Sequence, residues 1–127
     1  MSSFSDYLED AVLNHVFRNS ALTSPTTTYL ALYTAAPTDA GAGTQVTGAG
    51  YARKAITFGA PSGGAIANTS AVSFTAAGGN YGNVVAVGIF DAATAGNLLA
   101  WDEITSATVN DTDTLNFAIG DIDLSLT

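Results

Sequence analysis

The sequence contains no cysteine, and only three of its 127 residues are lysine or arginine. Without cysteine the chain has neither a disulfide framework nor a thiolate metal site, so its stability must come from packing or from assembly. The three cations stand against eleven acidic residues, which gives a net charge of −8. This negative field repels phosphate groups and anionic lipids, so we expect no nucleic acid and no membrane among the partners.

Long apolar runs and targeting signals are also missing. No stretch of eighteen apolar residues occurs, and the first residues lack the basic and apolar regions of a signal peptide, so we expect a soluble, unexported chain. Hydrophobic residues make up 47% of the sequence and charged ones 11%, which predicts a neutral, hydroxyl-rich surface. At this length the chain suits one domain, residues 1–127, with one core.

The stretch 84–104 organises the predicted fold. Residues 84–90 are apolar at nearly every position, which is typical of a central strand that is covered on both faces. Residues 91–97 are rich in turn formers, and residues 98–104 resume an extended pattern that includes the only tryptophan, Trp101. We therefore expect a hairpin at the centre of the molecule.

An N-terminal helix is predicted over residues 5–19. Asp6 and Glu9 approximate a capping box, and Arg18 suits the negative end of the helix dipole. Apolar side chains recur at intervals of three and four residues and predict one stripe that packs on the domain. The stripe consists of Phe4, Leu8, Ala11, Val12, His15 and Val16.

The remainder predicts short strands with glycine-rich turns. Residues 28–34 place tyrosines on one face and leucines on the other, and residues 51–58 direct Arg53 and Lys54 to opposite faces. Residues 35–50 form a long loop that we expect to be exposed and mobile, and residues 105–114 are polar and turn-rich. Further strands are predicted near residues 65–68, 71–75, 115–119 and 122–126, the last two with alternating apolar side chains.

These patterns predict a mainly β fold. Seven or eight short strands at spacings near ten residues indicate an antiparallel β-sandwich or a Greek-key barrel, with the N-terminal α-helix laid against one edge. The helix would occupy residues 5–19 and the β domain residues 28–127, with the long exposed loop at 35–50.

Catalytic constellations are absent from the sequence. His15 is the only histidine and lies on the apolar stripe of the helix, and no nucleophile elbow occurs in the sequence. Asp102 and Glu103 are adjacent in a strand and face opposite sides, which is poor geometry for an acid and base pair. The glycine-rich stretches lack the Gly-Lys-Ser/Thr ending of a phosphate-binding loop. We expect no enzyme activity and no cofactor.

Two features leave alternatives open. Asp111, Asp113, Asp121 and Asp123 offer oxygen ligands that suit calcium, but the glycine and glutamate of a calcium loop are missing, so solvated strand ends explain them as well. Tyrosines supply contact area with a polar tip, although half of them are expected in the core. The interface residues that we predict are Tyr33, Pro37, Asp39, Tyr51, Arg53, Lys54 and Tyr81.

Three strings carry a resemblance to known proteins. They are YLALYTAAPT at 29–38, YARKAITFGAPSGGAIANTSAVSF at 51–74 and YGNVVAVGIFDAATAGNLLAWDEI at 81–104. Together they resemble a family of small virion structural proteins of tailed bacteriophages, which includes capsid cement proteins and so-called tail fibre proteins. In that family a Leu-Tyr or Leu-His-Thr strand is followed by Pro and Thr, here 32–38. A Tyr-Ala-Arg-Lys strand follows, here 51–54 after Ala49 and an inserted Gly50, and then a Val-Gly-Ile-Phe-Asp strand, here 87–91.

The resemblance implies a structural role in the virion rather than catalysis. The first hypothesis is a capsid decoration or cement protein that binds the outer surface of the head, with the major capsid protein as its partner. The alternative is a tail or fibre component that recognises a host-surface glycan through an exposed tyrosine or Trp101. A small hydrolase is disfavoured because no nucleophile and base pair is present. We also expect self-association into a dimer or trimer, because a surface with so few charges is typical of interfaces.

Overall fold

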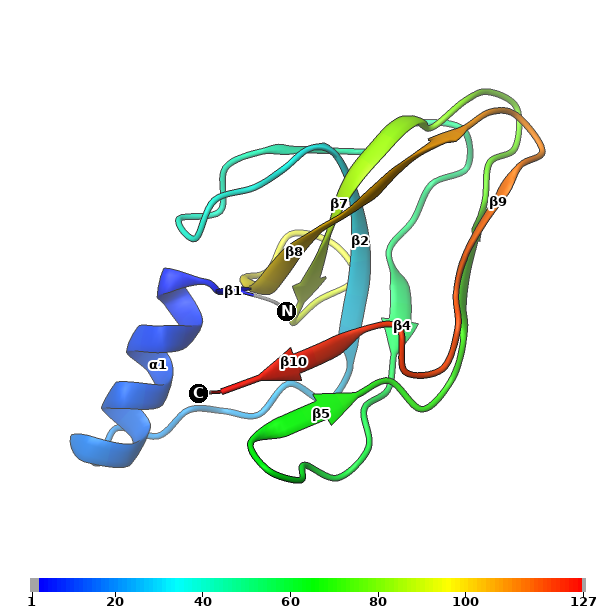
Figure 1. The fold of residues 1–127 in the computed structure, drawn as a ribbon. Coiled ribbons are helices and arrows are strands. Elements are labelled where there is room, and N and C mark those ends of the chain that lie inside the picture. The colour runs from blue at the N-terminus through cyan, green and yellow to red at the C-terminus, as the bar shows by residue number, and fades with distance from the viewer. Residues whose placement is uncertain (1–2, 127) are drawn as a thin grey trace.

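The computed structural model describes residues 3–126 and shows a mainly β protein with an N-terminal helix (Figure 1). All strand pairs are antiparallel, so the predicted fold class is confirmed. Within these residues the strand order does not return to its first strand, so the sheets form no closed barrel and the barrel alternative is wrong. Residues 1, 2 and 127 of the predicted domain lie outside the described residues.

The strands form one large sheet and two small ribbons. The large sheet has the order β1-β8-β7-β2-β3, and β4 pairs with β2 beside β3. The ribbons are β10-β5 and β6-β9. The elements are β1 (Ser3–Phe4), α1 (Asp6–Phe17), β2 (Thr28–Ala35), β3 (Thr44–Gln45), β4 (Lys54–Ile56), β5 (Ala65–Ala67), β6 (Val72–Thr75), β7 (Gly82–Phe90), β8 (Leu98–Val109), β9 (Thr114–Phe117) and β10 (Asp123–Ser125).

The predicted central hairpin is confirmed as β7 and β8. β7 lies between β2 and β8, and all its residues from Ala86 onward are buried. The register shifts between Val84, which pairs with Ala107, and Ala86, which pairs with Glu103, and Val84 packs in the same cluster as Val87 rather than with Ala86. Strict alternation along the strand would place Val84 on the same face as Ala86, and the β-bulge is the physical reason for the difference.

The large sheet is covered on both faces. We call the larger cluster the main core; it lies between the sheet and the two ribbons and joins Leu30, Leu32 and Val87 to Phe74 and Phe117. The second core, on the other face, consists of Ala31, Tyr33, Ala86, Phe90 and Leu98. The predicted division of β2 into a leucine face and a tyrosine face is therefore confirmed.

The second core explains the glycine within the central strand. A Cβ atom on Gly88 would lie 2.8 Å from Cε2 of Tyr33 and 2.9 Å from Cδ1 of Leu98. Real Cβ atoms almost never approach other atoms so closely, because the repulsion between them is steep. The tyrosine ring therefore packs directly over the backbone of β7.

Several predicted boundaries are wrong. β8 continues to Val109, through most of the stretch that its polar composition assigned to turns, because it pairs with β7 over this whole length. The predicted strand at 51–58 shrinks to β4. The loop 35–50 contains β3 and a main-core residue, Val46, so it is not exposed throughout. Near the C-terminus the alternation holds only in part, because Ile119 and Leu126 are exposed.

The outer edge of β8 is open for much of its length. β1 pairs with Ala100 and Trp101 alone, and no other strand in residues 3–126 pairs with that edge. The residues that follow Trp101 begin with Asp102 and Glu103 and continue with several hydroxyl side chains. The sheet therefore ends on this side in a polar strand.

Asn68 ties the ribbons together. Its side chain is 2% exposed and makes four hydrogen bonds. Nδ2 donates to the carbonyls of Ser70 and Ala118, at 2.8 and 3.1 Å. Oδ1 accepts from the backbone N–H groups of Gly120 and Ile122, at 2.9 and 3.0 Å. The amide thus supplies hydrogen-bond partners to backbone groups of the irregular chain between β9 and β10, as a neighbouring strand would do in a sheet.

We predict that Asn68→Ala lowers the free energy of unfolding by about 3 to 5 kcal/mol, because it removes four hydrogen bonds and leaves backbone groups without partners. Urea denaturation followed by circular dichroism measures the change. Asn116→Ala, at an exposed position of β9, is the control and should cost less than about 1 kcal/mol. Equal losses in the two variants would contradict the structural role of Asn68.

We also predict that Val87→Asp prevents stable folding. The side chain is 5% exposed in the main core, and an unpaired carboxylate there costs several kcal/mol against a total stability of roughly 5 to 15 kcal/mol. Asn83→Asp on the exposed face of the same strand is the matched control and should unfold like the unaltered protein. A soluble Val87→Asp protein with a cooperative unfolding transition would refute the position of β7.

Candidate functional site

Most of the predicted interface tyrosines lie in the interior. Tyr33 and Tyr81 are 3% and 6% exposed. Tyr51 is half-buried, its hydroxyl accepts from the N–H of Leu32 at 3.0 Å, and its ring packs on Phe74 and Tyr81. The hydroxyl of Tyr81 donates to the carbonyl of Thr75 at 3.0 Å. These rings stabilise the core, so the expectation that half of the tyrosines belong to it fits better than a tyrosine surface.

The other predicted interface residues do not form one surface. The guanidinium of Arg53 lies 3.6 Å from the ring centre of Phe90, and Nη1 donates to the carbonyls of Ala92 and Ala95, both at 2.8 Å. Arg53 therefore holds the loop after β7 in place. Pro37 is buried, whereas Asp39 and Lys54 are exposed on different elements. For all seven residues the interface stays a prediction.

The acidic residues near the C-terminus serve as local hydrogen-bond acceptors. Asp113 accepts from the N–H of Asn110, Asp121 from that of Ala118, and Asp111 from that of Gly78. Within residues 3–126 no three acidic or histidine side chains come together as a metal site requires. Turn geometry accounts for Asp113 and Asp121, because short polar side chains commonly bond nearby backbone groups, whereas Asp111 joins its turn to the distant loop at Gly78.

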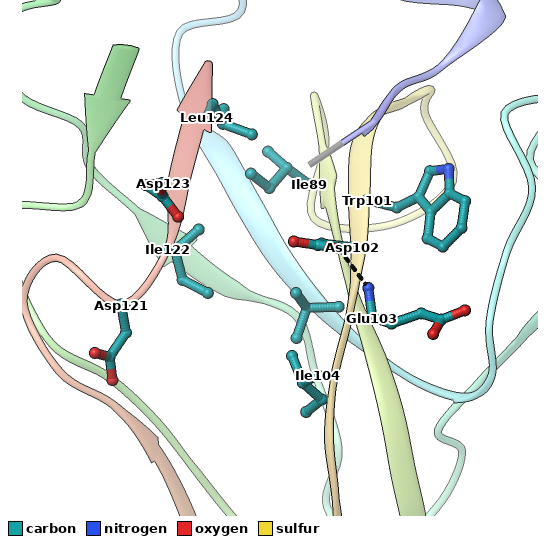
Figure 2. A pocket seen from close by; sticks show the side chains of 10 residues that line it. Ile89, Trp101, Asp102, Glu103, Ile104, Asp121, Ile122, Asp123 and Leu124 are labelled. Carbon is teal, nitrogen blue, oxygen red and sulfur yellow. Dashed lines mark hydrogen bonds between the residues drawn. The ribbon is translucent and has the colours of Figure 1, made fainter. Parts of the chain in front are cut away.

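One cleft lies between β8 and β10 (Figure 2). Its volume is about 140 Å³. Figure 2 shows Asp102 on the side of β8 that faces β10, whereas Trp101 and Glu103 extend from the other side of the strand. Apolar side chains with Asp102 and Asp123 at the margin make a narrow, acidic cleft. The apolar lining consists of Val87, Ile89, Ile104, Ile122 and Leu124.

A wider depression, which we call the Tyr7 pocket, lies where α1 begins. Its volume is about 300 Å³. The first residues of α1, the loop at 39–41 and the end of the β7–β8 turn line it together. Its polar side chains are those of Ser5, Asp6, Tyr7, Asp39 and Asn97, and its floor includes Phe90 and Leu98. Convergent polar groups over an apolar floor are typical of small-molecule sites.

Hydrogen bonds fix the walls of the Tyr7 pocket. Ser5 caps α1, because its Oγ accepts from the N–H of Leu8 at 3.1 Å, so the predicted cap at Asp6 is displaced by one residue. The N–H of Asp6 donates to the carbonyl of Asp39 at 2.9 Å. Nε1 of Trp101 donates to Oδ1 of Asp39 at 2.8 Å. Helix, loop and sheet are thereby joined at one point.

α1 itself presents large apolar side chains to solvent. Its predicted bounds are confirmed to within two residues, but none of its residues is buried. Leu8, Ala11 and Val12 of the predicted stripe are half-buried, while Val16 is 60% exposed. Among the described residues, four of the six exposed large hydrophobic side chains belong to this helix. They are Tyr7 at 43%, Leu13 at 55%, Val16 at 60% and Phe17 at 77%.

The comparison with known proteins decides the family. The sequence model of a family described as "Podophage GP4 fiber I protein gp80" matches residues 3–125. The chain belongs to the gp80 fiber I family. No curated protein matches the sequence. Members of a fiber I family are components of phage fibres in the virion, so the expected structural role in the virion is confirmed at this level.

Membership in the gp80 family favours the second hypothesis over the first. Capsid decoration was the leading expectation, and the family description instead names a fibre. The family is structural, in agreement with the expectation of a non-enzymatic protein. No helix among the described residues has the length and apolar character needed to cross a membrane.

Sequence reasoning missed Tyr7, Leu13, Phe17 and Asn97. Leu13 and Phe17 lie off the predicted stripe, and their spacing of four residues was the available signal for a second apolar face. Asn97 was assigned only to a turn. Its position in the Tyr7 pocket depends on the distant loop at 39–41, which local patterns do not reveal.

The buried tyrosines predict a loss of stability at high pH. Burial raises the pKa of Tyr33 to about 12, from 10 in the unfolded chain, although the charge of Arg53 opposes this shift. Between these values the unfolded chain releases a proton that the folded protein retains, so stability is complete below pH 10 and declines as the pH rises toward 12. The free energy of unfolding obtained from urea denaturation should be lower at pH 11 than at pH 9, by about 1 kcal/mol from this group alone. A Tyr33→Phe variant should lose less stability over this interval, and an equal loss would contradict the assignment.

Proposed function

We propose that this chain is a fibre subunit that self-associates through α1 and recognises the surface of the host cell. The observation that carries the first part is the group of large apolar side chains that α1 exposes. Exposed apolar clusters on a chain of few charges are typical of protein interfaces. The fibre family supports the second part, because fibres are positioned to meet the cell.

The helix needs packing that its own domain does not supply. A helix of twelve residues is marginally stable in water, and most helical stability in proteins comes from burial of an apolar face. Leu13, Val16 and Phe17 have the spacing i, i+3 and i+4 and therefore share one face. They are directed away from the half-buried side of α1, so burying them requires a second molecule.

The charges of α1 favour an antiparallel pair. Asp6, Glu9 and Asp10 occupy its first half, and Arg18 follows its last turn. A parallel pair would place the acidic halves together, whereas an antiparallel pair brings Arg18 toward the acidic half of the partner and opposes the helix dipoles. Two copies related by a two-fold axis satisfy both the apolar face and the charges. A dimer is therefore the favoured form of the predicted dimer or trimer.

Capsid decoration remains the second candidate, with the major capsid protein as partner. Its support is the negative charge of the chain, which would complement a basic patch on a shell. Immunogold labelling of virions separates the two candidates, because the fibre role places the label on fibres and decoration places it over the whole head. Label confined to the head would overturn the fibre proposal for this chain.

The helix interface predicts a specific loss of association. Phe17→Ser should remove about 2 kcal/mol of apolar burial from each copy, and thus raise the dissociation constant of a symmetric pair by about 10³-fold. Sedimentation equilibrium measures this against a dimer mass of twice 12.8 kDa. Ile119→Ser is the matched control, because Ile119 is 68% exposed but lies after β9, away from the helix.

Two results would contradict this prediction. One is that the unaltered protein stays a monomer at every concentration. The other is that Phe17→Ser and Ile119→Ser change the dissociation constant equally. Circular dichroism of both variants verifies that the fold is retained.

A further inference from the structure

We propose that the Tyr7 pocket is a binding site for an uncharged saccharide. This inference rests on the proposed host-recognition function and names the site and the class of ligand. The pocket lies at the junction of α1, the loop at 39–41 and the β7–β8 turn, and none of these residues is needed for the apolar contact proposed for Leu13, Val16 and Phe17. One subunit can thus associate and bind ligand at the same time.

The polar groups of the pocket are held in place before any ligand arrives. Asp91 accepts from the backbone N–H of Asn97 with Oδ1 at 2.7 Å, and from Nδ2 of Asn97 with Oδ2 at 2.9 Å. The amide of Asn97 is therefore oriented by a carboxylate behind it. Trp101 in the same way orients the carboxylate of Asp39. Groups that are ordered in advance lose little entropy on binding, which favours affinity for a small ligand.

The turn that carries Asn97 has a backbone that supports this arrangement. Gly96 has a φ of +72°, and a Cβ atom there would lie 2.5 Å from Oδ1 of Asp91. Glycine adopts such a left-handed conformation without strain. The turn can therefore close tightly around Asp91 and present Asn97 at the margin of the pocket.

The chemistry of the lining matches a sugar. Carboxylate and amide oxygens accept hydrogen bonds from hydroxyl groups, and the amide and phenol groups also donate them. The ring of Tyr7, 43% exposed, offers a flat apolar surface with a polar tip, which suits the C–H face of a pyranose. Phe90 and Leu98 supply an apolar floor. The volume of about 300 Å³ lies at the lower end of the range for small-molecule sites.

The charge of the lining selects among sugars. Asp6 and Asp39 are both exposed carboxylates, and residues that line the pocket include no lysine or arginine. An anionic saccharide such as a uronic acid would meet two like charges without compensation, on a chain whose net charge is −8. The structure therefore assigns neutral sugars, including N-acetylated ones, to this site.

A glycan array tests the inference with the full-length protein. The array should hold neutral, N-acetylated and anionic oligosaccharides of bacterial envelopes, and the strongest binder should then be titrated by calorimetry. We expect binding to neutral or N-acetylated glycans and at least tenfold weaker binding to their uronic acid counterparts. Tyr7→Ala and Asn97→Ala should each weaken the affinity about tenfold or more.

Control variants make the result decisive. Thr94→Ala changes the same turn outside the lining of this pocket and should bind like the unaltered protein. Phe17→Ser should retain the affinity per chain, because it alters the association face alone. Preference for anionic glycans, or binding that both pocket variants retain, would overturn this site while leaving host recognition intact.

Absence of binding to every glycan would overturn the inference and the host-recognition part of the proposed function together. Association through α1 would be judged separately by the sedimentation experiment. Failure of the saccharide site, failure of host recognition and failure of self-association would therefore each give a different set of results.

Discussion

The structure depends on the burial of β7 from both sides. Because the strand is apolar on each face, both faces have to be buried. The ribbons β6-β9 and β10-β5 lie over one face, and on the other the side chains of Tyr33, Phe90 and Leu98, which project from the sheet itself, pack together. The apolar area buried in these two clusters is the main favourable contribution to folding. The guanidinium of Arg53 holds the loop after β7, and the amide of Asn68 holds the chain between β9 and β10.

How far the sequence predicts this fold depends on the range of each interaction. β7 follows from its continuous apolar run and the hairpin with β8 from the turn formers after it, whereas the two faces of β2 follow from local alternation. The length of β8 follows from its pairing with β7, which overrides a polar composition that favours turns. The burial of Tyr81 and the assembly of the Tyr7 pocket depend on contacts between distant segments, such as Trp101 with Asp39, and no local pattern encodes them.

Scarce positive charge shapes the functional surface. Arg53 is committed to the interior contacts of the β7–β8 turn, and Arg18 donates to Asn14 at the end of α1. Apart from the exposed side chains of Arg18 and Lys54, what the molecule offers to partners is therefore apolar, hydroxyl-bearing or acidic. Such a surface suits association with a copy of the same chain and with neutral ligands, and both are consistent with a fibre component at the exterior of a virion.

The open edge of β8 matters when many copies of the protein lie close together. Unpaired strand edges are templates for the stacking of sheets into insoluble aggregates, and this danger grows when many copies stand close together on one particle. Asp102 and Glu103 place charge at the start of that edge, and the repulsion between equal charges hinders two such edges from joining. The charges at this edge therefore act against edge-to-edge pairing between neighbouring copies.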